Sequence, residues 1–154
     1  MMFKVNFTFH RDADVIYGND TLKPHTDQSI GIDLRACFTE NFIDVPSGSR
    51  KCIPLGISIE PISKGIAGYL YSRSGVGAVK GLILAQGVGI IDPDYRGELT
   101  AWMYNTCPAP YRIEKGDRIV QLIFQPYMIV HMTRVNELTQ SLRDAGGFGH
   151  TGLQ

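Results

Sequence analysis

The sequence predicts an all-β fold, either a β-barrel or a jelly roll, formed by a single domain. Short apolar and β-branched stretches recur along the chain, and 17 glycines and 8 prolines separate them. Strands at such spacing with turn residues between them are typical of all-β domains. No window longer than about two turns shows the 3.6-residue period of an amphipathic helix. At 154 residues the chain is long enough for one domain, residues 1–154, with a sizeable core.

The N-terminal half begins with a clear strand pattern. In residues 3–9, three phenylalanines and a valine alternate with Lys4, Asn6 and Thr8, as in a half-buried strand. Residues 10–30 are polar and rich in turn formers, and residues 32–38 are a short segment of mixed character. A turn is expected at VPSG, residues 45–48, followed by strands at 52–59 and 65–71.

The C-terminal half continues the alternation of strands and turns. Strands are expected at 81–85, 99–105 and 118–125, with turns at 105–110 and 114–117 between the later ones. Residues 128–135 favour one more strand. After it the composition changes to RDAGGFGHTGLQ, so residues from about 136–154 are expected to form a flexible, glycine-rich C-terminal arm.

Composition and charge exclude several classes of protein. Hydrophobic residues make up 44% and charged residues 19%, which is typical of a globular chain rather than a disordered one. The 15 basic and 15 acidic residues cancel, which argues against a nucleic-acid binder that relies on bulk charge. A small anionic ligand held by a few local cations stays compatible with this balance.

The cysteines and the N-terminus indicate the compartment. Three cysteines, Cys37, Cys52 and Cys107, lack the even number of a disulfide framework and the spacing of a zinc site, so buried free thiols are expected. The N-terminal residues MMFKVNFTFH have no apolar run like that of a signal peptide, and no window is long and apolar enough for a membrane span. We expect a cytoplasmic protein without membrane contact.

One bend carries more charge than a turn requires. Residues 89–100 read GIIDPDYRGELT, with Asp92 and Asp94 close together and Tyr95 directly after them. A surface turn needs only Asp, Pro and Gly, so the additional charges and the aromatic ring call for a functional explanation.

The glycine-rich tail is the second candidate. Successive glycines allow backbone N–H groups to form a concave nest for phosphate, and the planar guanidinium of Arg143 suits phosphate oxygens. Phe148 has no apolar neighbours there, and His150 and Thr151 add polar groups. The alternative is a frayed terminus; the residues favour a phosphate clasp with a stacking ring.

Three further clusters are weaker on their own. SRSG, residues 72–75, suits phosphate but equally suits an ordinary turn. Gln121 occupies an inward-facing strand position, where an unpaired amide costs about 1–3 kcal/mol, so it is either a ligand-binding residue or a satisfied core residue. Asp33 and Arg35 share one strand face and are alternatively a surface ion pair worth about 0–1 kcal/mol.

Taken in order, these clusters resemble the five motifs of the trimeric deoxyuridine triphosphatases (dUTPases). IGIDLRA resembles the first, SRSGVG the second, GIIDPDYRGE the third, GDRIVQLI the fourth and RDAGGFGHTG the fifth. Spacing and length also agree, so the resemblance covers essentially the whole chain. It implies a jelly-roll-like β-barrel subunit in a homotrimer with active sites shared between subunits, and Mg²⁺-dependent hydrolysis of dUTP to dUMP and pyrophosphate. It implies no direct contact with nucleic acid.

The resemblance also implies roles for individual residues. Asp92 matches the catalytic acid that orients the attacking water, Tyr95 the ring that packs on deoxyribose, and Asp33 a residue that meets Mg²⁺ through water or supports an arginine. Arg118 is expected to hold Asp92 in place. The residues implied to contact substrate are Arg73, Ser74, Gly75, Gln86, Gly89, Ile91, Tyr95, Met103, Arg118, Gln121, Arg143, Phe148, Gly149, His150 and Thr151.

The sequence departs from the family pattern at a few positions. Ser72 stands where the second motif usually has proline, so we expect a looser turn, and Asp144 stands where the fifth usually has glycine. The rival dCTP deaminases share the fold but need a glutamate where this chain has Trp102. A trimer that binds dUTP and mainly regulates a partner protein is a second alternative, and the presence of Asp92 and Arg143 favours the enzyme.

Overall fold

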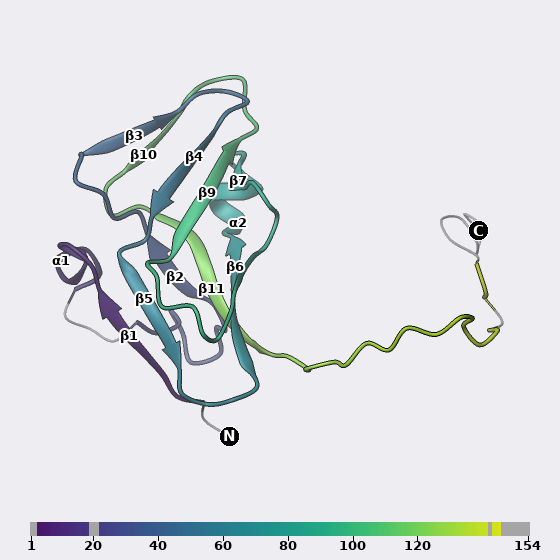
Figure 1. Cartoon of the computed structure of the whole chain (residues 1–154). Coiled ribbons are helices and arrows are strands. Elements are labelled where there is room, and N and C mark those ends of the chain that lie inside the picture. Colours follow the sequence, from purple (N-terminus) through teal and green to yellow (C-terminus); the bar gives the residue numbers. More distant parts are fainter. Residues whose placement is uncertain (1–2, 19–21, 142, 146–154) are drawn as a thin grey trace.

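A computed structural model describes residues 3–18, 22–141 and 143–145 (Figure 1). Within this part of the chain nearly all regular secondary structure is strand, with only two short helices, which confirms the predicted all-β class. The strands and the two short helices are β1 (Val5–Phe9), α1 (Ala13–Tyr17), β2 (Ile32–Arg35), β3 (Phe42–Val45), β4 (Arg50–Pro54), β5 (Ile57–Pro61), β6 (Ile66–Ser72), α2 (Ser74–Gly77), β7 (Leu82–Leu84), β8 (Gly89–Ile91), β9 (Thr100–Asn105), β10 (Tyr111–Glu114) and β11 (Arg118–Pro126).

All strand pairs are antiparallel and enclose one core. The largest sheet has the order β2-β11-β6-β8, a second has the order β4-β9-β7, and two further pairs are β1-β5 and β3-β10. Leu34 of β2, Ile53 of β4, Leu70 of β6, Met103 of β9 and Leu122 of β11 all belong to the same buried cluster. The sheets therefore pack onto a common interior, as expected for a jelly-roll-like barrel.

The strand predicted at 52–59 is in fact two strands. β4 ends at Pro54 and β5 begins at Ile57, with Gly56 at φ +71° between them. A Cβ on Gly56 would come within 2.6 Å of the Cys37 sulfur and 2.7 Å of the Ala13 Cβ. This close packing and the left-handed backbone both require glycine, and they break the strand.

Three short strands were not predicted. β3 and β10 pair with each other, and β8 is a three-residue strand inside the stretch interpreted as a charged bend. Each is only three or four residues long, too short for a period-two pattern to be distinctive.

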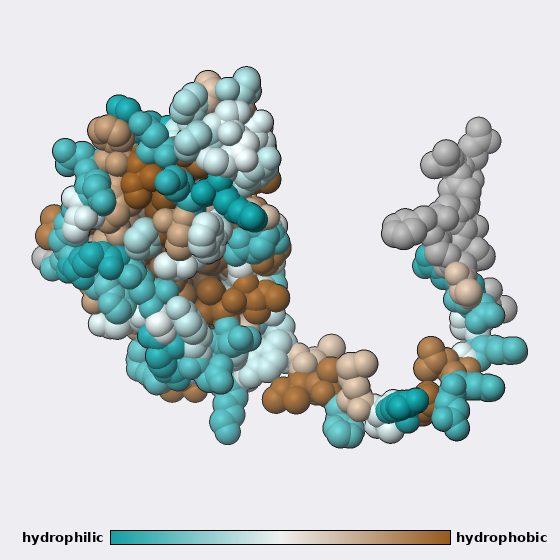
Figure 2. Space-filling model, turned by 45° about the horizontal axis from the view of Figure 1, so that its top comes forward, coloured by the Kyte–Doolittle hydropathy of each residue, from teal (hydrophilic) through white to brown (hydrophobic). Residues whose placement is uncertain are grey.

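The strand predicted at 128–135 is wrong for the single chain. The backbone N–H of Tyr127 still donates to the Gly65 carbonyl at 3.1 Å, and beyond it the chain leaves the body and pairs with none of the described strands (Figure 1). Met128, Ile129 and Leu138 are 88–89% exposed. Figure 2 shows the resulting brown apolar side chains along the departing segment. An apolar pattern alone predicts a strand, but a strand forms only where a neighbouring backbone is available.

The cysteines are only partly as expected. Cys37, Cys52 and Cys107 are all free thiols, but Cys37 alone is buried, while Cys52 is exposed and Cys107 intermediate. Burial raises the pKa of the Cys37 thiol. No helix among the described residues has the length and apolar character of a membrane span.

Candidate active site

The charged bend forms a tight turn at the end of β8. The Tyr95 N–H donates to the Asp92 carbonyl at 3.0 Å, which closes a four-residue turn with Pro93 at its second position. Asp at the first position and Pro at the second are favoured in such turns. The Arg96 guanidinium donates to the Pro93 carbonyl at 2.8 Å and adds support. Asp92 itself is exposed, so its carboxylate is open to solvent and ligand.

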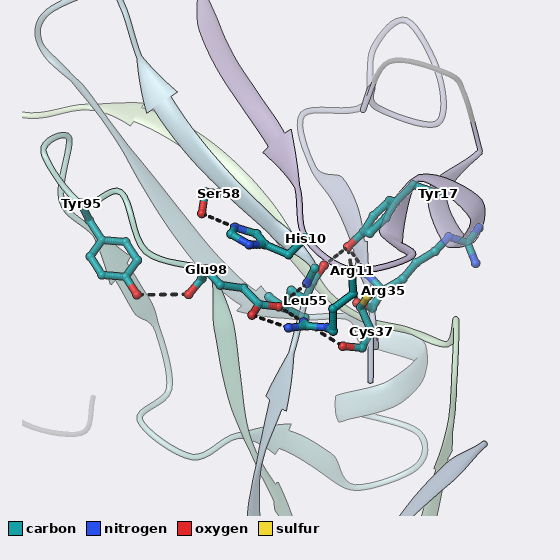
Figure 3. A network of polar contacts seen from close by, with 10 residues as sticks. His10, Arg11, Tyr17, Arg35, Cys37, Leu55, Ser58, Tyr95 and Glu98 are labelled. Carbon is teal, nitrogen blue, oxygen red and sulfur yellow. Dashed lines mark hydrogen bonds and ion pairs between the residues drawn. The ribbon is translucent and has the colours of Figure 1, made fainter. Parts of the chain in front are cut away.

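The Tyr95 ring is fixed at both ends. Its backbone is held by the turn, and its hydroxyl donates to the Glu98 carbonyl at 3.1 Å (Figure 3). The ring lies over Gly97, where any Cβ would collide with it. Tyr95 is 46% exposed and lines the adjoining hollow, so the residue stays accessible to a ligand.

Asp92 and Tyr95 border a hollow of roughly 380 Å³, a size that suits a small organic ligand. Gln86, Gly89 and Ile91, which sequence analysis assigned to substrate binding, also line it. Met103 does not, because its side chain is fully buried in the core and its backbone lies between β4 and β7. Met103 can only support the hollow from behind.

β8 gives this hollow a hydrogen-bonding wall. Among the described strands it pairs only with β6, through Gly89–Leu70, Ile90–Tyr69 and Ile91–Gly68, so it forms one edge of the four-stranded sheet. An edge strand has N–H and C=O groups that a ladder partner does not use. A planar ligand with its own donors and acceptors can therefore bind along β8.

A second cluster lies at the opposite edge of the same sheet. The Arg73 guanidinium donates to both Asp33 oxygens, with Nε–Oδ1 at 2.7 Å and Nη2–Oδ2 at 3.0 Å. Arg118 Nη1 lies 3.4 Å from Asp33 Oδ2, and Arg73 also donates to the Arg118 carbonyl at 3.0 Å. The alternative ion pair of Asp33 with Arg35 is wrong, because Arg35 donates instead to the Gly116 carbonyl at 2.8 Å. The guanidinium of Arg73 can donate two parallel hydrogen bonds to the Asp33 carboxylate, and this bidentate pairing replaces the pair expected with Arg35 on the same strand.

Gln121 belongs to this second cluster. Its amide nitrogen donates to the Ser72 carbonyl at 3.2 Å, so the amide is partnered. A Cβ on Gly31 would stand 2.5 Å from Gln121 Oε1, which shows how closely the amide packs there. The Ser72 hydroxyl accepts a bond from the Leu84 N–H at 2.9 Å, so serine fastens the turn that was expected to be looser. Ser74 and Gly75 follow at the exposed start of α2.

The tail is described only in part. Arg143 is exposed, and Asp144 has φ +42°, in the left-handed region that glycine favours and that Asp tolerates. This is the position at which the motif that the tail resembles usually has glycine. The Asp144 N–H donates to the Ser141 hydroxyl at 2.9 Å. Four predicted site residues lie outside the described part of the chain: Phe148, Gly149, His150 and Thr151.

Within one chain the two clusters are far apart. β2 and β8 are the edges of a four-stranded sheet, three spacings of about 4.8 Å, or roughly 14 Å, from each other. Asp33 pairs through Gln121 with Tyr71 of β6, whereas Ile91, before Asp92, pairs with Gly68. The two positions are therefore also offset by roughly 10 Å along the strands. Because this offset is perpendicular to the roughly 14 Å across the sheet, the direct distance is near ~17 Å. Since Arg73 and Arg118 lie beside Asp33, neither touches Asp92 of the same chain.

Sequence analysis gave no role in the site to two polar or aromatic residues of the hollow, or to one residue that supports it. Glu98 and Trp102 line the hollow, and Arg11 binds the Glu98 carboxylate from a distant part of the chain. Glu98 was visible as surplus charge in the bend. Arg11 gave no local signal, because its partner is 87 residues away.

No three His, Cys, Asp or Glu side chains gather into a metal-binding group in the described ranges. The arginine cluster contains one carboxylate, that of Asp33, and it already bonds to two arginines. Such a carboxylate is suited to contact a hydrated cation that a phosphate chain carries, and is not suited to bind a bare metal ion by itself.

Comparison with known proteins gives a consistent family. The dUTPase family model matches residues 19–152. A deoxyuridine 5'-triphosphate nucleotidohydrolase of Mannheimia succiniciproducens is 44% identical over 129 residues, covering 84% of this chain and 85% of the relative. That of Alcanivorax borkumensis is 40% identical over 147 residues, covering 94% and 97%.

Solved structures give the same fold. The dUTPase of Streptococcus mutans matches with a TM-score of 0.68 and 27% identity, covering 82% of this chain and 98% of the other. The dUTPase of Staphylococcus bacteriophage 80alpha with dUpNHpp matches with a TM-score of 0.81, covering 97% and 99%; at 22% identity this likeness concerns the fold.

Proposed function

The chain belongs to the dUTPase family, and from this premise we propose that Asp92 activates the water that cleaves dUTP into dUMP and pyrophosphate. The observation that supports this role is the position of Asp92, exposed at the mouth of the hollow beside Tyr95. A carboxylate there can accept a hydrogen bond from water, orient it towards the α-phosphorus and take up its proton as the bond forms. The oxygen bridging to pyrophosphate then leaves.

The hollow is proposed to select the nucleoside. The unused backbone groups of β8 would pair with the edge of uracil, whereas cytosine presents the opposite pattern and would leave buried groups unpaired, a discrimination of about 10⁴-fold or more. The thymine methyl would overpack the hollow at typically 1–3 kcal/mol. Tyr95 would pack on deoxyribose and leave no space for a 2′-hydroxyl.

Deamination does not suit the same hollow. A deaminase needs a group that shuttles protons at the base, and Trp102, 47% exposed on the wall of the hollow, carries only an indole N–H donor. Hydrolysis at the phosphate remains the reaction that these residues can perform.

We propose that the complete site is shared between copies of the chain in a homotrimer. The separation of roughly 17 Å between the two clusters supports this, because groups acting on one triphosphate must converge on it. In the trimer, Asp92 of one copy would meet Arg73, Arg118 and Gln121 of a neighbour. The exposed apolar segment around Met128, Ile129 and Leu138 would be covered by another copy.

The phosphate chain would be held by two groups of residues. The fixed part would consist of Arg73 directly after β6, Ser74 and Gly75 at the start of α2, and Gln121 on β11, while Arg118 would orient Asp92 of the neighbouring copy. The second part is the tail, in which Arg143 would grip the outer phosphates. The proposed tail contacts are completed by Phe148, stacked on uracil, and by Gly149, His150 and Thr151 around the phosphates.

Mg²⁺ is proposed as the cofactor, held by the triphosphate with Asp33 contacting it through water. When bound, it would neutralise negative charge on the phosphate oxygens. Asp33 would release part of its bond to Arg73 as the phosphates arrive, and Arg73 would turn to them. We further propose a cytoplasmic location, which suits the three free thiols, and a role in keeping uracil out of DNA while supplying dUMP for dTMP synthesis.

One assay tests this function. Pyrophosphate release is measured with dUTP, dCTP, dTTP and UTP side by side, with and without Mg²⁺. The expected result is fast release from dUTP alone, strongly reduced when the metal is chelated. Comparable release from dCTP or UTP would contradict the proposed base and sugar contacts, and full activity without Mg²⁺ would contradict the cofactor.

A further inference from the structure

Arg11 occupies a strained position between β1 and α1. Its φ is +53°, in the left-handed region that non-glycine residues adopt only when other contacts compensate. The compensation is visible in Figure 3, where the guanidinium reaches the carboxylate of Glu98 in the loop between β8 and β9. Arg11 Nη1 donates to Glu98 Oε2 at 2.9 Å, and Nη2 donates to Glu98 Oε1 and, at 3.1 Å, to the Cys37 carbonyl.

The Glu98 carboxylate is held from a second side as well. The Gly56 N–H donates to Glu98 Oε1 at 2.9 Å. The Glu98 side chain is 21% exposed and that of Arg11 35%. Burial alone would raise the pKa of Glu98, but the bonds from Arg11 and Gly56 hold it below its usual value. The carboxylate is therefore charged and immobilised by three N–H groups from two separate segments.

This arrangement ends at the ring of Tyr95. The Leu99 N–H donates to the Ile57 carbonyl at 2.8 Å, and in a trans peptide the preceding carbonyl points the opposite way. That carbonyl belongs to Glu98 and accepts the Tyr95 hydroxyl at 3.1 Å. The peptide between Glu98 and Leu99 is thus fixed by β5 on one side and by the Glu98 side chain on the other. The position of the Tyr95 hydroxyl depends on the position of this peptide, because the hydroxyl donates to its carbonyl.

We propose that Arg11 and Glu98 are positioning residues for Tyr95, and that this pair sets how strictly the enzyme refuses a ribose 2′-hydroxyl. The inference rests on the proposed function, in which Tyr95 packs on the sugar. Without the pair, the Glu98 carbonyl gains freedom, the ring moves with it, and space opens for the additional hydroxyl. Specificity for the sugar then depends on a residue near the N-terminus that touches no part of the nucleotide.

The test compares kcat/KM for dUTP with kcat/KM for UTP. Glu98→Gln keeps the shape of the side chain but removes its charge and one acceptor, and Arg11→Lys keeps the charge but removes the fork. Each is expected to lower the dUTP/UTP ratio of kcat/KM by roughly fivefold or more, about 1 kcal/mol. In Arg11→Lys, which changes no residue of the hollow, kcat for dUTP is expected to change less than about twofold. Arg11→Lys is expected to retain more of the ratio than Arg11→Ala.

The matched control is another ion pair that also carries two guanidinium–carboxylate bonds. Arg112 binds Asp44 at 2.9 and 3.0 Å on the β3-β10 pair, away from the hollow. Asp44→Asn is expected to leave the dUTP/UTP ratio unchanged. Thermal unfolding of every variant separates a loss of stability from a loss of selectivity.

A double-mutant cycle distinguishes positioning from a general structural effect. Tyr95→Phe keeps the ring and removes the hydroxyl, so in that background Glu98→Gln is expected to have no further effect on the ratio. Equal effects of Glu98→Gln with and without the hydroxyl would overturn the proposal, as would an unchanged ratio in Glu98→Gln and Arg11→Ala. If Tyr95→Ala also leaves the dUTP/UTP ratio unchanged, the proposed contact between Tyr95 and the sugar is wrong. If Tyr95→Ala lowers the ratio and Glu98→Gln does not, only the positioning role of Arg11 and Glu98 is wrong.

Discussion

The Tyr95 ring lies directly against the backbone of Gly97. A Cβ on Gly97 would come within 2.5 Å of the ring carbon Cζ, closer than any real contact between such atoms. The ring and the glycine therefore determine each other: glycine allows the ring to lie flat across the bend, and the ring leaves no space for another residue. The contact therefore fixes the ring at the wall of the hollow that Asp92 also borders.

Gly97→Ala is accordingly expected to displace the ring without removing it. The dUTP/UTP ratio of kcat/KM should fall by roughly three- to tenfold, since overpacking on this scale forces side chains from their positions. Gly75→Ala is the steric control for stability, because a Cβ there would meet nothing within 4 Å and the backbone has no positive φ. Gly87 also has open space, but its φ of +78° would strain any other residue. Thermal unfolding of Gly75→Ala then shows what an added methyl group does where space is available, and an unchanged ratio in Gly97→Ala would contradict the contact.

Asp92→Asn tests the proposed catalytic acid. The amide has nearly the same shape but cannot take up a proton, so kcat should fall by about 10²–10⁴-fold, the usual contribution of a general base. Binding of dUTP, measured by calorimetry with a non-hydrolysable analogue, should change little. Asp94→Asn, in the same turn, serves as the control and should keep most of the activity. Near-normal turnover in Asp92→Asn would refute the assignment.

Removal of the tail from residue 143 tests the clasp. Turnover is expected to fall by roughly a hundredfold or more, because the outer phosphates lose the groups that position them. Light scattering should show an unchanged oligomer, since the strands that form the core end at Pro126. Unchanged kinetics in the truncated protein would remove the tail from the mechanism.

The Glu98 carboxylate predicts a pH dependence of stability. Its pKa lies below the usual value in the folded protein, so the unfolded chain binds more protons in acid and the stabilisation is present above the unfolded value of about 4.3. This contribution is lost as the pH falls through the lower folded pKa. Melting temperatures from pH 6 to pH 3 should therefore fall less steeply in Glu98→Gln than in the parent protein; parallel curves would contradict the linkage.

The sequence was sufficient for the fold class and for the turn beside the hollow because those signals are local. The turn at Asp92 and Tyr95 follows from an Asp-Pro pair, and the strands around Leu70, Met103 and Leu122 follow from apolar patterning. Gly56 shows the limit of such patterns: the break between β4 and β5 depends on Cys37 and Ala13, which lie far away in the chain.

Long-range pairings could not be predicted for the same reason. Asp33 binds Arg73 rather than Arg35, although Arg35 is only two residues away, because strand order brings the end of β6 to the edge strand. Arg11 and Glu98 meet across 87 residues. The placement of 128–135 likewise depends on whether another backbone lies beside it, which the local apolar pattern does not reveal.

The central claim is that Asp92 and Arg73 act on one nucleotide from different copies of the chain, and mixing two inactive variants tests it most directly. Asp92→Asn and Arg73→Gln carry different affinity tags, are co-expressed, and mixed oligomers are purified through both tags. Each variant alone should be nearly inactive, whereas mixed trimers should recover activity at about a third of their sites, where an intact Asp92 faces an intact Arg73 across a subunit interface. Mixed oligomers that stay as inactive as either parent would contradict the shared site.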